Sequence, residues 1–440
     1  MKKILRIIAT AAGCIVIISA AVYFLYQSFF NPRRGEADKI EKSLPLEYVL
    51  TRDEALEDVQ YLFAKLKNHH PAWLEKNNQN VDAINSLFLS LEKNIPDTIT
   101  ILQLWREVSS IISILHDGHT NVSWNNPGEE LYIDDFTIPP LYFNPVKINY
   151  QNIEEILCEY LKMSSYEYDF YAIHRFYDSV IYTKSSLDFL GVDTSTGVTY
   201  TYLENDTPVN FCFEFVPYGE AKKETVSDES KWVSYFIDDE KSLGIFTLMT
   251  CDLNDEYRTV LSEFFNEVYD KSIKSIAVDL RGNGGGHSGV ANAFLQYVDV
   301  DIYKSWDNAV RYGPVLWKNT DVKVTNTKKA PLFSGNLYVL TNVYSYSSAM
   351  DFAMLIKDND LGLVIGEASG NSPDSYGDNL YFQMPNSKLY FTVSHKKWYR
   401  INKDKAGLPI EPDYECRSAD VIETLYKIIT TENPEEFIRR

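Results

Sequence analysis

Two short segments hold the residue types that hydrolytic chemistry needs. The first is Ser275-Ile-Ala-Val-Asp-Leu-Arg-Gly-Asn-Gly-Gly-Gly286, an apolar run that ends in clustered glycines. Without a Cβ, glycines let backbone N–H groups approach a ligand closely, as an oxyanion hole requires. The pattern is equally typical of a tight strand-to-helix turn. Its spacing matches neither G-x-x-x-x-G-K-[ST] nor G-x-G-x-x-G, the two common phosphate-binding loops.

The second segment is a serine-rich turn. A strand pattern over 337–341 leads into Ser345, Ser347 and Ser348, and a helical pattern follows. A serine at a helix start is most often an N-cap. Three serines exceed what one cap needs, and the helix N-terminus would stabilise an oxyanion beside a nucleophile. The turn therefore holds either a cap or a nucleophilic serine.

Together with Gly366-Glu-Ala-Ser-Gly370, these two segments resemble the tail-specific, or C-terminal processing, serine peptidases. The resemblance covers roughly residues 235–415. It implies an α/β core of the crotonase and Clp-protease kind that hydrolyses polypeptides. It also implies Ser347 as the nucleophile, with the backbone amides of Ser348 and Gly285 as the oxyanion hole.

The general base departs from the best-known members of that family, which use a lysine where this chain has Ser372. The segment Leu115-His-Asp-Gly-His-Thr-Asn-Val122 instead resembles the "DGHT" motif of a tricorn-like branch that uses histidine. By that resemblance His119 takes the hydroxyl proton of Ser347, as a neutral imidazole can. There are two alternatives: His119 caps a turn, or it ligates a metal together with His116. No third ligand signature lies nearby, so we expect no metal and no cofactor.

A catalytic triad also needs an acid that orients the histidine. The segment Gly407-Leu-Pro-Ile-Glu-Pro-Asp413 resembles a family segment near the end of the core. Glu411 is therefore the first candidate, followed by Asp413 and Glu367. Carboxylates in such loops are usually solvated or turn-forming, which is the alternative for all three.

The patterns around these segments predict the elements that position them. Strand and helix patterns alternate over 231–440, which indicates an α/β peptidase core with a partly parallel sheet. Thr51 and Glu54 form a capping-box signature, and apolar residues at helical spacing follow, so 51–129 is predicted to be a helical N-terminal domain. For 130–230 we expect a shortened PDZ-like or irregular region of short strands. Lys147–Leu157 resembles the end of a PDZ-like module, whereas 139–145 leave out its glycine-rich carboxylate-binding loop.

The N-terminus predicts a transmembrane helix. Ile7 to Phe30 contains no charged side chain, and about 20 apolar residues suffice to cross a bilayer. We assign 1–34 to an anchor and 35–50 to a linker. More basic residues precede the apolar run than follow it, so the N-terminus is expected in the cytoplasm and the rest outside. A cleaved signal peptide, or a lipoprotein signal at Cys14, is the alternative.

Composition excludes several classes of protein. A net charge of −20 would repel nucleic acid, and five scattered cysteines fit neither a zinc finger nor a disulfide scaffold. The sequence therefore predicts a membrane-anchored extracytoplasmic serine endopeptidase that acts on polypeptides; it sets no oligomeric state. The alternative is an inactive relative that binds peptides or apolar ligands. An esterase using Ser288 is weaker, because Val290 replaces the second glycine of the G-x-S-x-G elbow.

Overall fold

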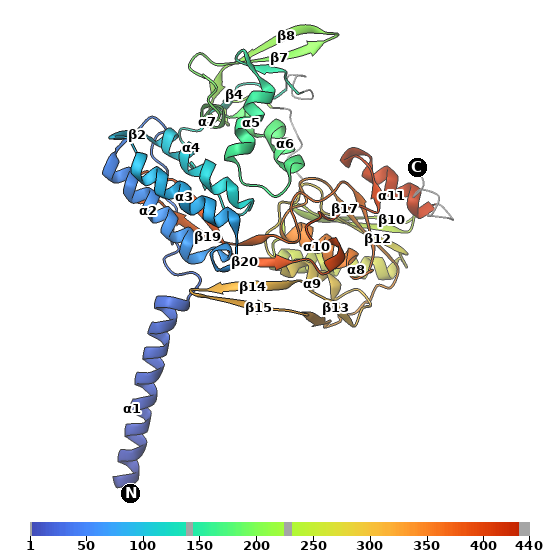
Figure 1. The fold of residues 1–440 in the computed structure, drawn as a ribbon. Coiled ribbons are helices and arrows are strands. Elements are labelled where there is room, and N and C mark those ends of the chain that lie inside the picture. Colours follow the sequence, from blue (N-terminus) through green and yellow to red (C-terminus); the bar gives the residue numbers. More distant parts are fainter. Residues whose placement is uncertain (1, 138–143, 224–230, 431–440) are drawn as a thin grey trace.

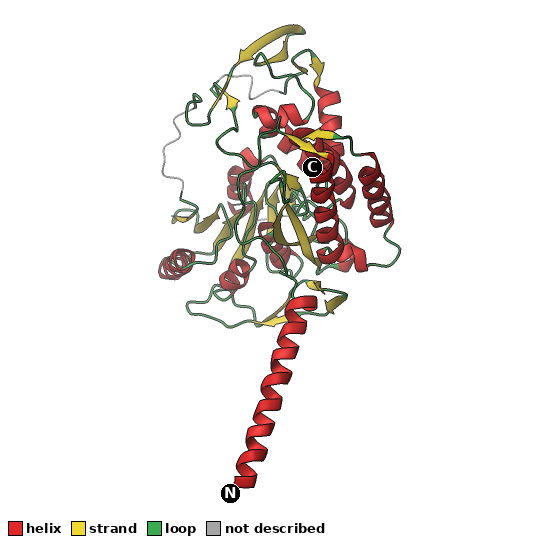
Figure 2. Ribbon diagram, turned by 90° about the vertical axis from the view of Figure 1, so that its left-hand side faces the viewer, coloured by secondary structure: helices red, strands yellow, loops and turns green. Residues whose placement is uncertain are grey.

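The computed structural model describes residues 2–137, 144–223 and 231–430 (Figure 1). Helix α1 (Lys2–Leu25) continues into one π-helical turn (Tyr26–Phe30), and it stands away from the rest of the molecule in both views (Figures 1 and 2). Its stretch Ala12–Phe30 is long and apolar enough to cross a membrane, and none of it is buried. A signal sequence near the N-terminus has the same properties.

A helical lobe, residues 49–124, follows. The capping box predicted at Thr51 and Glu54 is confirmed, and Thr100 forms a second one with Gln103. The apolar faces of the lobe's helices pack in one cluster with side chains from two strands near the C-terminus, among them Leu380 and Phe391. The hydrophobic core of this lobe therefore requires chain from far downstream. The elements are β1 (Val49–Thr51), α2 (Arg52–His69), α3 (Gln79–Asn94), β2 (Thr98–Thr100), α4 (Ile101–Ile112) and β3 (Val122–Ser123).

A middle lobe, residues 132–216, contains the short strands expected there. Its described residues also form three α-helices that were not expected, two of them capped by the side chains of Asn152 and Thr183. Helix α5 buries Ile153, Ile156, Tyr160 and Met163 at helical spacing, so its period was present in the sequence. Part of the segment that suggested a shortened carboxylate-binding loop, 138–143, lies outside the described residues. The elements are β4 (Tyr132–Ile133), β5 (Lys147–Ile148), β6 (Gln151–Asn152), α5 (Ile153–Met163), α6 (Asp169–Asp178), α7 (Lys184–Phe189), β7 (Val198–Glu204), β8 (Thr207–Phe213) and β9 (Phe215–Val216).

The α/β core, residues 233–430, is built on a six-stranded sheet of order β10-β11-β12-β17-β18-β21. Strand β10 is antiparallel to β11, and the later pairs are parallel. Helices α8, α9 and α10 cover one face, and α11 covers the other. The elements are β10 (Val233–Asp238), β11 (Leu243–Leu248), α8 (Asp255–Asp270), β12 (Ser275–Asp279), α9 (Gly289–Leu295), β17 (Asn336–Thr341), α10 (Ser348–Lys357), β18 (Leu363–Gly366), β21 (Tyr414–Glu415) and α11 (Val421–Thr430).

A second sheet joins the α/β core to the helical lobe, in the order β15-β14-β20-β19 (Figure 1). Its longest strand, β20, also pairs with β3 of the helical lobe. This pairing brings the loop before β3, which contains His119, alongside the α/β core. The elements are β14 (Asp307–Tyr312), β15 (Val315–Asn319), β19 (Tyr376–Gln383) and β20 (Tyr390–Tyr399); β13 (Ile302–Lys304) pairs with β16 (Lys323–Thr325) nearby.

Candidate active site

Ser347 lies where β17 leads into α10, at the carboxyl edge of the parallel sheet. Its φ of 52° falls in the left-handed region that residues with a side chain rarely adopt. A buried side chain fixes this turn: the Ser347 N–H donates to Oδ1 of the fully buried Asn371 at 2.7 Å. A strained backbone fixed in this way is typical of a functional site.

The neighbouring serines have other partners. Ser345 is fully buried, and its Oγ donates to the carbonyl of Leu280 at 2.8 Å. Ser348 Oγ donates to the carbonyl of Gly286 at 2.7 Å. Of the three hydroxyls, only that of Ser347 contacts a histidine.

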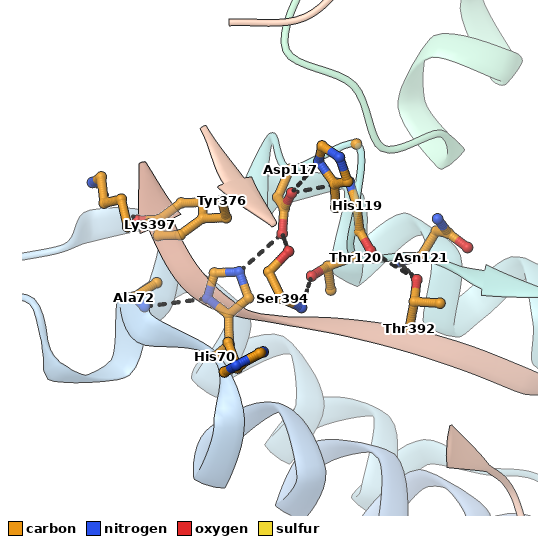
Figure 3. A network of polar contacts seen from close by, with 12 residues as sticks. His70, Ala72, Asp117, His119, Thr120, Asn121, Tyr376, Thr392, Ser394 and Lys397 are labelled. Atoms are coloured by element: carbon orange, nitrogen blue, oxygen red, sulfur yellow. Dashed lines mark hydrogen bonds and ion pairs between the residues drawn. The ribbon is translucent and has the colours of Figure 1, made fainter. Parts of the chain in front are cut away.

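That histidine is His119. Its Nε2 lies 3.1 Å from Ser347 Oγ, although the two residues are 228 positions apart in the chain. Strand β20 fixes the loop: Thr392 Oγ1 donates to the carbonyl of His119 at 2.8 Å, and the Ser394 N–H donates to Thr120 Oγ1 at 3.0 Å (Figure 3). The helical lobe and the α/β core thus each supply one member of a serine–histidine pair.

Asp117 supports the histidine loop. Its Oδ1 accepts the His119 N–H at 3.0 Å and lies 3.8 Å from His119 Nδ1 (Figure 3). Its Oδ2 accepts from His70 Nε2 at 3.1 Å and from Ser394 Oγ at 2.7 Å. His70 Nδ1 accepts the Ala72 N–H, so in neutral His70 the proton is on Nε2, directed at Asp117.

The electrostatics of this group favour a neutral His119. Burial alone would raise the pKa of Asp117, but the hydrogen bond from His70 and the nearby imidazoles outweigh it and lower that pKa to about 2. Burial lowers the pKa of His119, and the charge of Asp117 opposes this shift only in part. Asp117 is therefore an anion beside a neutral imidazole, which is the protonation state that a general base requires.

The proposed oxyanion-hole amides differ from each other in the structure. Gly285 packs directly against the Ser347 turn, since a Cβ there would lie 2.7 Å from Ser347 Cβ, and its φ is +102°. Its N–H, however, donates to Asn283 Oδ1 at 2.8 Å. The Ser348 N–H is the first amide of α10 and has no hydrogen-bond partner among the described residues.

Comparison with known proteins identifies the family of the α/β core. Residues 243–416 match the model of peptidase family S41. The match assigns the α/β core of the chain, which contains Ser347, to this family. The chain is a serine peptidase, as the resemblance of its motifs implied. No curated protein matches it in sequence.

Solved structures resemble the S41 chain in fold. Mature CPAF superimposes with a TM-score of 0.58 at 12% identity, covering 86% of this chain and 95% of that one. Mature CPAF complexed with lactacystin gives a TM-score of 0.56 at 12% identity, covering 86% and 96%. At this identity the likeness establishes the fold alone, which is the mixed α/β fold of S41 peptidases. The match with CPAF extends over most of the chain.

The predicted acid, Glu411, lies elsewhere in the S41 chain. It is half-exposed, pairs with Lys405 at 3.7 Å, and lines a cavity with Asn336 and Lys357. These residues begin β17 and end α10, whereas Ser347 lies at the other end of both elements. Because α10 has ten residues, its ends are about 15 Å apart. Glu411 at this position cannot orient His119, and the assignment needs correction.

The two lesser carboxylate candidates are structural. Asp413 accepts the Val364 N–H at 2.8 Å and pairs with Lys357. Glu367 accepts the Ser418 N–H at 2.8 Å. Both hold loops at the sheet edge, and Asp117 is the carboxylate closer to His119.

The two lysines that come next after position 372 in the sequence, Lys388 and Lys396, are also in ion pairs. The buried Ser372, at the lysine position of other members, accepts the Asp374 N–H at 3.1 Å. Lys388 pairs with Glu41, and Lys396 pairs with Asp378. A histidine base therefore agrees with the contacts of the S41 chain better than a lysine does.

Sequence reasoning missed several residues of the site. Asn283 is fully buried, accepts the Gly285 N–H through its side chain and the Tyr346 N–H through its carbonyl, and so joins the two turns. It stands inside the glycine segment, and Asp117 stands inside the histidine segment, so both motifs held a signal for them. Asn371 directly follows the Gly366–Gly370 segment and lies outside its motif.

Potential metal ligands also meet in this part of the S41 chain. Asp117, His119 and Glu167 bring ligand atoms within 4.8 Å of one another. Both carboxylates already accept hydrogen bonds from protein donors: Asp117 from His70, and Glu167 from Tyr346 and Gly118. Hydrogen bonding accounts for the cluster.

Proposed function

We propose that this S41 peptidase is a membrane-anchored, extracytoplasmic serine endopeptidase that hydrolyses polypeptides through an acyl-enzyme on Ser347. The observation that carries the proposal is the 3.1 Å contact between His119 Nε2 and Ser347 Oγ. A hydroxyl within hydrogen-bond distance of a neutral imidazole is the arrangement of an activated nucleophile. An inactive, peptide-binding relative would have no need of this pair.

The reaction follows from the geometry. His119 Nε2 accepts the hydroxyl proton as Ser347 Oγ attacks the scissile carbonyl, and the Ser348 N–H donates to the oxyanion. An amide of the Gly284–Gly286 turn supplies the second donor once substrate is bound. Protonated His119 then gives its proton to the leaving amine, while the nearby Asp117 anion stabilises the imidazolium. Water attacks the acyl-enzyme by the same proton path.

Labelling with a fluorophosphonate tests this proposal. Because the probe phosphonylates only an activated serine, we expect the purified full-length chain to be labelled, with the adduct on the peptide that contains Ser347. Mass mapping identifies the site. Labelling at Ser288 would favour an esterase, and absence of any adduct would favour the inactive binding protein.

The membrane assignment is supported by the unburied helix α1 and by the basic residues Lys2, Lys3 and Arg6 that precede its apolar stretch. We expect protease added to intact cells, or to spheroplasts where an outer membrane is present, to digest residues 35–440. Alkaline carbonate should leave the undigested protein in the membrane pellet. Protection of the whole chain would reverse the orientation, and release of a shortened soluble form would indicate a cleaved signal peptide.

A further inference from the structure

The middle lobe also reaches the catalytic pair, through the segment between α5 and α6. Glu167 Oε2 is joined to Tyr346 Oη at 2.9 Å, and its Oε1 accepts the Gly118 N–H at 3.3 Å. Gly118 directly precedes His119, and Tyr346 directly precedes Ser347. One side chain from a third lobe therefore connects the residue before the base to the residue before the nucleophile.

The packing around this connection is close. The rings of Tyr346 and His119 have centroids 5.3 Å apart. A Cβ on Gly118 would lie 2.1 Å from Tyr346 Oη and 2.9 Å from Glu167 Oε2, so a side chain there would displace Tyr346 or Glu167. On the other side of Tyr346, the ring of Tyr171 from α6 packs at 4.7 Å. A displacement of Glu167 would thus be transmitted to both catalytic side chains.

We propose that Glu167 is a positioning residue for hydrolysis: it joins Gly118 to Tyr346 and thereby sets the approach of His119 Nε2 to Ser347 Oγ. Catalysis then depends on contact between the middle lobe and the other two lobes. The inference rests on the proposed function, because it requires His119 and Ser347 to be the reacting pair.

The charge state of Glu167 gives the proposal a distinctive signature. The side chain faces Asp117 and His119 from the helical lobe, Tyr346 from the α/β core, and Tyr168 and Tyr171 from its own lobe. Burial, and then the charge of Asp117, raise its pKa to about 8, although its hydrogen bonds with Tyr346 and Gly118 act in the opposite direction.

Glu167 is therefore protonated near neutral pH, where it keeps its hydrogen bond with Tyr346 Oη and accepts the Gly118 N–H through Oε1. Above that pKa, ionisation places a second negative charge near Asp117. Repulsion between the two carboxylates then weakens the link between the lobes. Activity should fall on the alkaline side as pH rises through the pKa of Glu167.

The test compares Glu167→Ala with Glu167→Gln in the full-length chain. Loss of the link in Glu167→Ala should lower kcat about 100-fold with little change in KM, the scale of a small misplacement of reacting groups. Glu167→Gln retains both hydrogen bonds in a neutral side chain. It should keep wild-type kcat near neutral pH and should lose the alkaline fall. Glu159→Ala, in an exposed pair with Lys162 on the same lobe, is the matched control and should behave as wild type.

The outcomes separate this proposal from the proposed function. If the wild-type chain carries no fluorophosphonate adduct on Ser347, the proposed function fails first. If Ser347 is labelled and Glu167→Ala turns over like Glu159→Ala, Glu167 has no positioning role. Should Glu167→Ala not fold, as judged by its thermal melting curve, Glu167→Gln decides. A pH profile without the alkaline fall supports the proposal, and one identical to wild type overturns it.

Discussion

Ser347→Ala should abolish fluorophosphonate labelling and lower kcat by on the order of 10⁶-fold, the scale seen when a serine nucleophile is removed. The covalent step needs the hydroxyl that His119 Nε2 meets at 3.1 Å, and neither neighbouring serine can replace it. Binding and the oxyanion donors remain in the variant, so a small residual rate is expected. Hydrolysis of an unstructured polypeptide, followed by release of new amino termini, measures the loss.

Ser348→Ala is the matched control for this variant. It loses the 2.7 Å hydrogen bond to Gly286 but keeps the backbone N–H, which is the group expected to act. Most of the activity should therefore remain, at a cost in stability of about 1 kcal/mol, typical of one hydrogen bond. An active Ser347→Ala with an inactive Ser348→Ala would move the nucleophile by one residue.

Much of the α/β core could be predicted because its central strands, β12 and β17, are buried on both faces. Such strands appear in a sequence as short continuous apolar runs, and 275–280 is one of them. The second sheet could not be predicted in this way. Strand β20 packs its apolar residues Phe391 and Val393 against the helical lobe but carries His395, Lys396 and Lys397 as it crosses to the α/β core. Its environment changes along its length, so no single period describes it.

The residues of the site also differ in whether a local motif or a long-range contact reveals them. Ser347 and His119 were accessible from sequence because each stands in a local motif, and the structure brings the two motifs together. The acid of the triad was assigned to Glu411 because its loop resembles a family segment. In the structure, Glu411 lies at the far end of α10. Asn371 and Glu167 contact residues from distant segments, the first at Ser347 N–H and the second at Tyr346 Oη. Only the folded chain shows such contacts.

His119→Ala should lower kcat by about 10²–10⁴-fold, the usual contribution of a general base, without loss of the fold. The pH profile of the wild-type enzyme is a second test of His119 as the base. Only neutral His119 accepts the proton of Ser347, so activity rises with pH as the imidazolium loses its proton. Burial lowers the pKa of His119, so the midpoint of this rise should lie below its ordinary value of 6.5. The rate should be measured against pH at limiting substrate, where kcat/KM reports the free enzyme.

Lys396→Ala separates this base from the family's lysine. Lys396 pairs with Asp378 and is predicted to have no part in proton transfer, so the variant should keep both the rate and the acidic midpoint of the wild type. His119→Ala should instead lose the acidic rise together with the rate, because the titrating group is gone. Unchanged turnover in His119→Ala would return the role to a lysine. A midpoint that moved in Lys396→Ala would identify that lysine, and a midpoint that stayed would direct the search to Lys388.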